Sequence, residues 1–180
     1  MQIQLAYGEG YLTVECPDDR TTVIKPNERE GISDERTAIY TALDTPTAGP
    51  PLRQLVKADT RICILFTDIT RATPNERMIP WLLDYLSFVP KENIVLLNQL
   101  GTHRPNSRSE LEKMLTREVV KNYHVLNAEP ENREAHIQLG TTRDGTPALI
   151  NRHAVEADLR IVTGFIEPHF FAGFSGGPKG

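Results

Sequence analysis

Three continuous apolar runs between residues 61 and 166 predict the central strands of the fold. Each run is short, as strands are, and each leads into polar or glycine-rich residues. Because polar residues do not alternate with apolar ones, we expect strands buried on both faces, as in a parallel sheet. The runs are RICILFTD (61–68), NIVLL (93–97) and LRIVTGFI (159–166).

Segments with the 3.6-residue spacing of amphipathic helices separate these strands. Residues 107–122 predict a helix capped by Ser109, and residues 33–43 predict a helix capped by Ser33 or Asp34. Strand, helix, strand, helix and strand in this order indicate a parallel α/β unit. The other helical segments are residues 52–57, 75–88 and 154–158.

Shorter alternating runs predict antiparallel additions to this unit. Residues 2–25 contain three such runs, with a turn at Gly8–Gly10, and predict an N-terminal antiparallel meander. Residues 123–128 predict a short strand. Residues 135–142 and 146–152 predict a strand pair inserted late in the chain, joined by a turn at Arg143–Gly145.

The expected fold class is therefore α/β, with a Rossmann-like parallel sheet flanked by helices, an N-terminal antiparallel meander and a small antiparallel insertion. We expect residues 1–180 to form one N-terminal α/β domain, with the β meander in residues 1–30 and the α/β core in residues 60–180.

Charge and composition exclude several classes of protein. The net charge of -4 and the lack of a dense Lys/Arg cluster argue against a nucleic-acid partner. The longest apolar runs are far shorter than a membrane span, and the N-terminus lacks the pattern of a secretory signal. The two cysteines, Cys16 and Cys63, form no dense pattern, which favours a reduced cytoplasmic protein.

Polar side chains follow each of the three apolar runs. Ligands of open α/β sheets bind beyond the carboxyl ends of the strands, so residues of these three loops are expected to meet in one crevice. The residues concerned are Asp68, Thr70, Arg71, His103, Arg104, His169, Ser175 and Lys179. Two histidines in one crevice could exchange the roles of general acid and general base, and an arginine suits a carboxylate.

Each of these residues also has a purely structural interpretation. Asp68 could cap a turn or helix, and Arg71 could pair with it at the surface. His103 could be a solvated loop residue, His169 a packed one and Lys179 an exposed lysine. The other histidines, which do not follow a buried strand, are interpreted as structural: His124, His136 and His153.

The glycine-rich segment AGFSGGPKG (172–180) is the strongest candidate for an anion site. Consecutive glycines allow successive N–H groups to face one phosphate or carboxylate. The spacing does not match a Walker loop. Lys179 could then be a point charge on that anion, or a nucleophilic amine that carries a cofactor.

Three motifs together resemble the N-terminal domain of the lactate racemase family, the nickel-pincer-nucleotide-dependent 2-hydroxyacid racemases and epimerases. The motifs are DITRATP (68–74), LGTHRP (100–105) and EPHFFAGFSGGPK (167–179). The resemblance implies an isomerase that acts on lactate or a similar 2-hydroxy acid.

The resemblance also assigns roles to individual residues. It implies that Lys179 is joined covalently to the cofactor, a pyridinium bis-thio mononucleotide that carries nickel. It implies that His103 and His169 are the catalytic acid/base pair and that Asp68 and Arg71 bind the substrate. We further expect three residues to lie near the cofactor phosphate: Ser175, Gly176 and Gly177.

The mechanism that the resemblance implies is proton-coupled hydride transfer. A histidine removes the hydroxyl proton while the C2 hydride passes to the cofactor, and the 2-keto acid takes the hydride back on its other face. The implied partners are the cofactor-biosynthesis enzymes and a C-terminal domain of the same protein.

In the family, the nickel ligand is a histidine downstream of the lysine. We therefore expect this chain to be an N-terminal fragment without the C-terminal domain, with no metal ligand of its own, no bound cofactor and no activity. Two alternatives remain open at this point: a non-catalytic domain that binds a nucleotide or organic anion through the glycine-rich loop, and a nickel-independent phosphate-ester enzyme that uses the two histidines.

Overall fold

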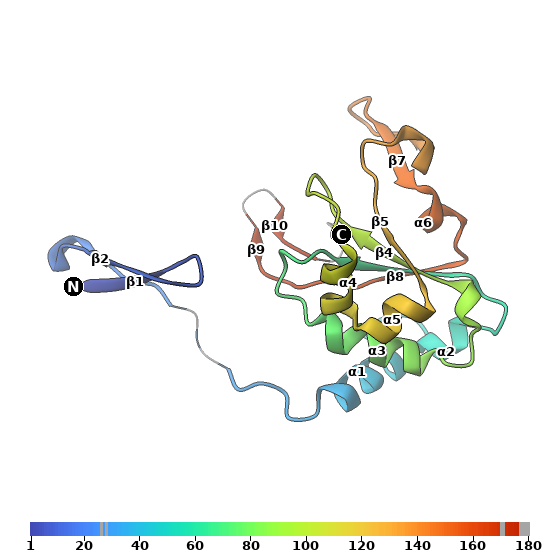
Figure 1. The fold of residues 1–180 in the computed structure, drawn as a ribbon, viewed down its shortest axis with the longest axis horizontal. Coiled ribbons are helices and arrows are strands. Elements are labelled where there is room, and N and C mark those ends of the chain that lie inside the picture. Colours follow the sequence, from blue (N-terminus) through green and yellow to red (C-terminus); the bar gives the residue numbers. More distant parts are fainter. Residues whose placement is uncertain (26, 28, 170–171, 177–180) are drawn as a thin grey trace. The chain divides into compact units, whose positions relative to one another are not determined.

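The computed structural model describes residues 1–25, 27, 29–169 and 172–176 (Figure 1). The chain divides into two compact units, Met1–Ser33 and Asp34–Gly180, which we describe separately. Of the helices formed by the described residues, none has the length and apolar character needed to cross a bilayer.

The N-terminal unit is a two-stranded hairpin. Strands β1 (Gln2–Tyr7) and β2 (Gly10–Glu15) pair in antiparallel fashion, with Leu5 opposite Leu12. A 3-10 helix follows at Asp18–Arg20. The expected third strand at residues 21–25 does not form; a 3-10 helix follows β2, and the sheet has two strands. The predicted meander is thus a hairpin.

The second unit is built on a parallel four-stranded sheet with the order β5-β4-β3-β8. The strands are β3 (Ile62–Thr67), β4 (Ile94–Gln99), β5 (His124–Asn127) and β8 (Leu159–Val162). The prediction of doubly buried strands is confirmed for β3 and β4. It is wrong for β8, which ends at Val162, lies at an edge of the sheet and has every second residue exposed.

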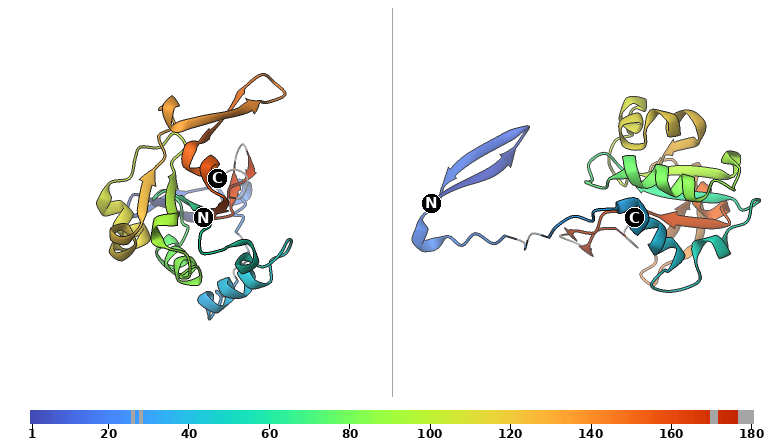
Figure 2. Two further views of the ribbon diagram at one scale, coloured as in Figure 1. Left: turned by 90° about the vertical axis from the view of Figure 1, so that its right-hand side faces the viewer. Right: turned by 90° about the horizontal axis from the view of Figure 1, so that it is seen from below.

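Helices cover both faces of this sheet (Figures 1 and 2). The main apolar core joins one face of β3 and β4 to α1–α5, with Phe66, Ile79 and Leu115 fully buried. On the other face, Cys63 and Leu97 pack against Ala154 of α6. The helices are α1 (Glu35–Asp44), α2 (Leu52–Leu55), α3 (Asn75–Tyr85), α4 (Arg108–Leu115), α5 (Arg117–Asn122) and α6 (Arg152–Glu156).

The segment predicted as one helix at 107–122 forms two. Thr116 has a φ of 79° and a ψ of 150°, a non-helical conformation that ends α4, and its side chain caps α5. The N-cap of α4 is Ser107, not Ser109. Ser107 forms a reciprocal capping box with Glu110, so the backbone N–H groups of both residues have hydrogen-bond acceptors.

Two small antiparallel pairs complete the unit. The predicted insertion is confirmed as β6 (His136–Thr141) and β7 (Pro147–Asn151), with an irregular register between Gln138 and Gly140. Close to the end of the described residues, β9 (Pro168–His169) pairs with β10 (Gly173–Phe174). Short 3-10 turns precede β4 and β6, at Lys91–Asn93 and Arg133–Ala135.

Candidate active site

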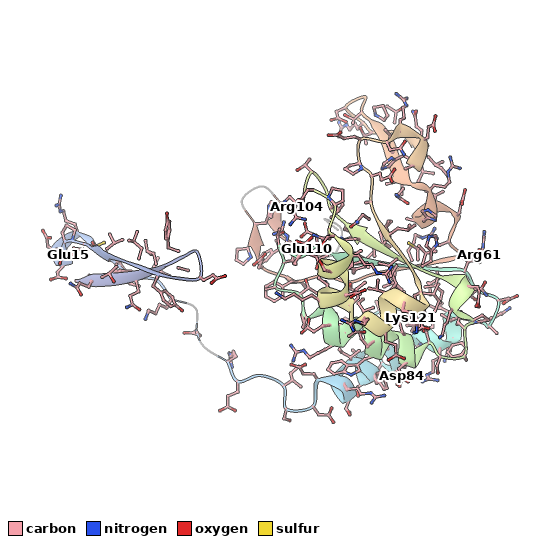
Figure 3. All side chains as sticks on the ribbon, in the orientation of Figure 1. Glu15, Arg61, Asp84, Arg104, Glu110 and Lys121 are labelled. Carbon is pink, nitrogen blue, oxygen red and sulfur yellow. The ribbon has the colours of Figure 1, made fainter. Side chains whose placement is uncertain are left out.

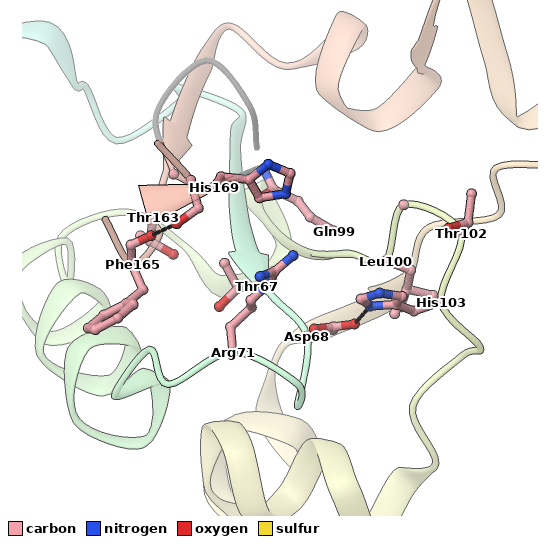
Figure 4. Close-up of a pocket in the computed structure, with 13 residues that line it drawn as sticks. Thr67, Asp68, Arg71, Gln99, Leu100, Thr102, His103, Thr163, Phe165 and His169 are labelled. Carbon is pink, nitrogen blue, oxygen red and sulfur yellow. Dashed lines mark hydrogen bonds and ion pairs between the residues drawn. The ribbon is translucent and has the colours of Figure 1, made fainter. Parts of the chain in front are cut away.

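A cavity of about 530 Å³ lies at the carboxyl ends of β3, β4 and β8 (Figure 4). This volume is in the range typical of small-molecule sites. The structure brings six of the sequence-predicted residues to its wall: Asp68, Arg71, His103, His169, Ser175 and Gly176. The predicted convergence of three loops on one crevice is thus confirmed for these residues. Gly177 and Lys179 lie outside the described residues.

Two of the expected residues lie elsewhere. Thr70 is not part of the cavity wall, although its hydroxyl donates to Asp68 at 2.7 Å. Arg104 is turned to α4, where its two guanidinium nitrogens lie 2.8 and 2.7 Å from the carboxylate oxygens of Glu110 (Figure 3). This hydrogen bonding, together with the Ser107 N–H, lowers the pKa of Glu110 to about 2.

Asp68 fixes the orientation of the His103 ring. Asp68 directly follows β3 and is 3% exposed, and one of its carboxylate oxygens accepts from the N–H and hydroxyl of Thr70. The other oxygen is hydrogen-bonded to His103 Nδ1. Because a carboxylate can only accept, the proton of His103 is on Nδ1, and Nε2 of the neutral ring is an acceptor. His103 is therefore not the merely solvated loop residue that one interpretation allowed.

His169 carries its proton on the opposite ring nitrogen. β9 and β10 pair in antiparallel fashion, and the backbone N–H of Ala172 lies 3.3 Å from His169 Nδ1, which accepts this hydrogen bond. A neutral ring that accepts at Nδ1 has its proton on Nε2. The two cavity histidines thus differ in tautomer: the Nε2 atom can accept a proton in His103 and can donate one in His169.

Arg71 pairs with Glu167 instead of Asp68. Its Nη1 lies 3.4 Å from Glu167 Oε1, and the Arg71 side chain remains partly exposed at the cavity. Sequence reasoning did not select Glu167. Its position directly before Pro168 and His169, in a motif already singled out, was the available signal.

Ser175 and Gly176 hold the glycine-rich loop against the segment that contains Phe165 and Glu167. The buried Ser175 hydroxyl donates to the Phe165 carbonyl at 2.7 Å and accepts from the Glu167 N–H at 3.1 Å. Gly176 has a φ of 74°, and a Cβ there would lie 3.1 Å from the Phe165 oxygen. Only glycine fits both requirements without strain. The Ser175 hydroxyl observed here holds the loop together, and its contact with a cofactor phosphate stays a prediction.

Sequence reasoning also missed residues on the cavity floor. Thr67 and Gln99 are register partners at the ends of β3 and β4. Both side-chain amide atoms of Gln99 are buried and have no hydrogen-bond partner among residues 1–25, 27, 29–169 and 172–176. Polar residues that end two adjacent buried strands were the signal for this pair. Within the described part of the chain, no group of three or more His, Cys, Asp or Glu side chains is arranged to hold a metal ion.

Comparison with known proteins identifies the family. A family model described as the lactate racemase N-terminal domain matches residues 7–180. The lactate racemase of Thermoanaerobacterium thermosaccharolyticum is 34% identical over 181 residues, covering 98% of this chain and 42% of that protein. The lactate racemase of Lactiplantibacillus plantarum is 36% identical over 146 residues, covering 81% of this chain and 34% of that protein.

A solved structure agrees with these matches. The lactate racemase apoprotein from T. thermosaccharolyticum superimposes with a TM-score of 0.81 at 32% identity, covering 98% of this chain and 42% of that one. The chain thus spans less than half the length of these relatives. It has the same α/β fold, and it belongs to the lactate racemase N-terminal domain family.

Proposed function

We propose that this chain forms one side of the active site of a 2-hydroxyacid racemase or epimerase, with His103 and His169 as the acid/base pair. The observation that carries the proposal is their placement on one cavity, with Nδ1 of His103 bonded to a carboxylate and Nδ1 of His169 accepting from a backbone N–H. A racemase must remove and return a proton on behalf of either enantiomer. Two histidines in complementary states meet this requirement near neutral pH.

The two rings exchange roles between the two directions. In one direction, His103 Nε2 accepts the proton of the substrate C2 hydroxyl. In the other, His169 acts as the acceptor at Nε2 after its ring proton has moved to Nδ1, which breaks the hydrogen bond from the Ala172 N–H. Asp68 holds the His103 ring in one orientation and stabilises the imidazolium that forms after proton uptake. The predicted role of Asp68 as a substrate-binding residue therefore becomes, in our proposal, a positioning role.

Arg71 is the proposed site for the substrate carboxylate. A guanidinium can bind both oxygens of a carboxylate and keeps its charge throughout the physiological pH range. Arg71 lies on the loop that also carries Asp68, and its backbone N–H donates to the Asp68 carbonyl at 3.1 Å. The carboxylate anchor and the residue that orients His103 therefore belong to one tight turn.

We also propose that Lys179 tethers a nickel-pincer nucleotide, as the family resemblance implies. The cavity volume of about 530 Å³ fits a bulky planar group. Ser175, Gly176 and Gly177 are the residues proposed to lie near its phosphate. When bound, the cofactor supplies a hydride acceptor, which side chains lack. The proposal also includes a nickel ligand, a C-terminal domain and the enzymes that make the cofactor. The free thiols of Cys16 and Cys63 favour a cytoplasmic location.

Substitution of either cavity histidine tests the acid/base assignment. In the full-length protein, co-expressed with the cofactor-making enzymes, His103→Ala and His169→Ala are each expected to slow racemisation at least ~100-fold in both directions. His136→Ala is the matched control, because that ring is bonded to the Asn132 carbonyl at 2.8 Å and is not part of the cavity wall. Near-normal turnover in either cavity variant would contradict the paired roles.

Intact-mass measurement of the same full-length protein tests the cofactor assignment. A mass increase that Lys179→Ala removes, together with bound nickel, supports the tether. An unmodified lysine and no nickel would favour the alternative of a non-catalytic anion-binding domain. Racemisation in deuterated water adds a second criterion, because retained protium at C2 supports hydride return, whereas deuterium uptake supports simple proton abstraction.

A further inference from the structure

Three buried or partly buried asparagines meet beneath the loop that carries His103. We propose that this asparagine cluster, formed by Asn98, Asn106 and Asn127, positions His103 against Asp68. The inference deepens the proposed function, since it rests on His103 being an acid/base residue. Asn98 is fully buried and Asn106 is 5% exposed, so these two members of the cluster are shielded from water.

The cluster fixes the end of the His103 loop through four hydrogen bonds. The Asn98 amide donates to the side-chain oxygens of Asn106 and Asn127, each at 2.9 Å. The Asn127 amide donates to the Asn106 carbonyl at 2.9 Å, and the Asn106 N–H donates to the Asn127 side-chain oxygen at 3.2 Å. Asn106 is therefore held through both its backbone and its side chain.

These bonds tie the loop to the rigid centre of the sheet. Asn98 and Asn127 are register partners on β4 and β5. Asn106 directly precedes Ser107, the N-cap of α4. At the start of the loop, the His103 N–H donates to the carbonyl of the buried Leu100 at 3.0 Å. The loop thus has an anchor on each side of His103, although the His103 side chain itself is 45% exposed.

The cluster also sets the position of this loop relative to the Asp68 loop. The Asn106 side-chain oxygen accepts from the backbone N–H of Ile69 at 3.4 Å, in addition to the bond from Asn98. Ile69 is the residue after Asp68. One oxygen atom is therefore bonded both to β4 and to the loop after β3, and it fixes the separation across which Asp68 and His103 interact.

The cluster carries a cost in stability. The side-chain oxygen of Asn98 is buried and has no hydrogen-bond partner among the residues that the structure describes. Buried polar groups are normally satisfied, and an unpaired one lowers stability. Violations of this kind are expected where a residue serves a site instead of the core. The side-chain amide of Asn98 donates two hydrogen bonds, which orient Asn106 and Asn127.

The tautomer of His103 provides a direct test in the full-length protein labelled with [15N]histidine. The His103 signals are identified by their loss in His103→Gln. The wild-type ring is expected to be mostly protonated on Nδ1. Asn106→Ala is expected to give a mixture of the two tautomers and to lower kcat about 100-fold by misplacing the ring. The KM for the 2-hydroxy acid is expected to change little, because Arg71 makes no bond to the cluster.

Val119→Ala is the control for simple destabilisation, because this buried residue packs in the core on α5. It is expected to lower stability and to leave the His103 tautomer unchanged. Asn127→Ala provides a second cluster variant, expected to behave as Asn106→Ala does. An unchanged tautomer in both asparagine variants, or an equal shift in Val119→Ala, would overturn the inference. An inactive wild-type enzyme would refute the proposed function and leave the tautomer result standing.

Discussion

The guanidinium of Arg71, a residue of the cavity wall, lies 3.4 Å from the carboxylate of Glu167. The side chain proposed to receive a substrate carboxylate therefore already has a carboxylate beside it. Both side chains are partly exposed, so the attraction between them is partly screened by solvent. An incoming anion competes with Glu167 for the same positive charge.

Replacing Glu167 by glutamine is expected to strengthen the binding of anionic substrates. The variant keeps the side-chain shape and the backbone bonds to Ser175 while it removes the competing charge. For a partly exposed ion pair we expect a two- to fivefold decrease in Kd, or about 0.4–1 kcal/mol. Calorimetric titration of the full-length protein with lactate measures this change. Weaker binding would show that Glu167 helps Arg71 to hold the anion.

Asp68→Asn is expected to slow catalysis by reversing the His103 tautomer. The Asn oxygen can still accept from Thr70, while its amide presents a donor to His103 Nδ1. The ring proton then moves to Nε2, and the base is lost. We expect kcat of the full-length enzyme to fall between about 10²- and 10⁴-fold. A variant with the wild-type kcat and a raised KM would instead support the original prediction that Asp68 binds substrate.

Gly176→Ala is expected to disrupt the glycine-rich loop more than Gly145→Ala disrupts its turn. Both glycines have a positive φ, 74° and 88°, so both alanines face a strain of about 1–2 kcal/mol. Only at Gly176 does a Cβ also come within 3.1 Å of a backbone oxygen. Amide hydrogen exchange at Ser175, whose N–H donates to the Glu167 carbonyl at 2.9 Å, measures the effect. An equal increase in amide exchange beside each of the two alanines would contradict the view that crowding adds to the strain at Gly176.

Acidification is expected to remove a stabilising contribution from Glu110. Its pKa falls from an ordinary 4.5 to about 2 in the folded protein, chiefly through hydrogen bonds from Arg104 and then from the Ser107 backbone. Because folding favours the ionised form, the contribution is present above pH 4.5 and is lost as the pH falls to about 2.

Glu110→Gln is expected to flatten the dependence of stability on pH in this window, since glutamine can keep the capping box with Ser107 but does not titrate. The free energy of unfolding, measured in denaturant at a series of acidic pH values, gives the slope. Glu131→Gln, at an exposed loop position, is the matched control. An unchanged slope in Glu110→Gln would show that other carboxylates dominate acid unfolding.

Much of the sheet could be predicted from the sequence because burial on both faces leaves a direct pattern. The runs at β3 and β4 are apolar throughout since helices cover both sides. The run at β8 has a similar composition, but a single sequence does not reveal the spatial order of strands, so its edge position was not foreseen. The break at Thr116 depends on how α4 and α5 pack on the core, which local spacing does not encode.

The candidate site was predicted in outline, since strand ends are easy to locate. His103 and Arg104 are adjacent in sequence and both lie in a polar loop, yet only His103 lines the cavity. The capping box of Ser107 and Glu110 places a carboxylate where Arg104 can reach it. The asparagine cluster was missed for a similar reason, because Asn127 lies 21 positions after Asn106 and meets Asn98 only when β4 and β5 pair.

The pairing of β8 with β3 has a consequence for biosynthesis. The hydroxyl of Thr163 donates to the carbonyl of Leu65, 98 positions earlier in the chain. At roughly 5–20 residues per second, a ribosome needs roughly 5–20 s to span this interval. The strands that carry Asp68 and His103 thus leave the ribosome well before the segment that carries His169. The proposed acid/base pair comes together only after β8, the last in sequence of the four parallel strands, adds to the edge of a sheet that can already exist.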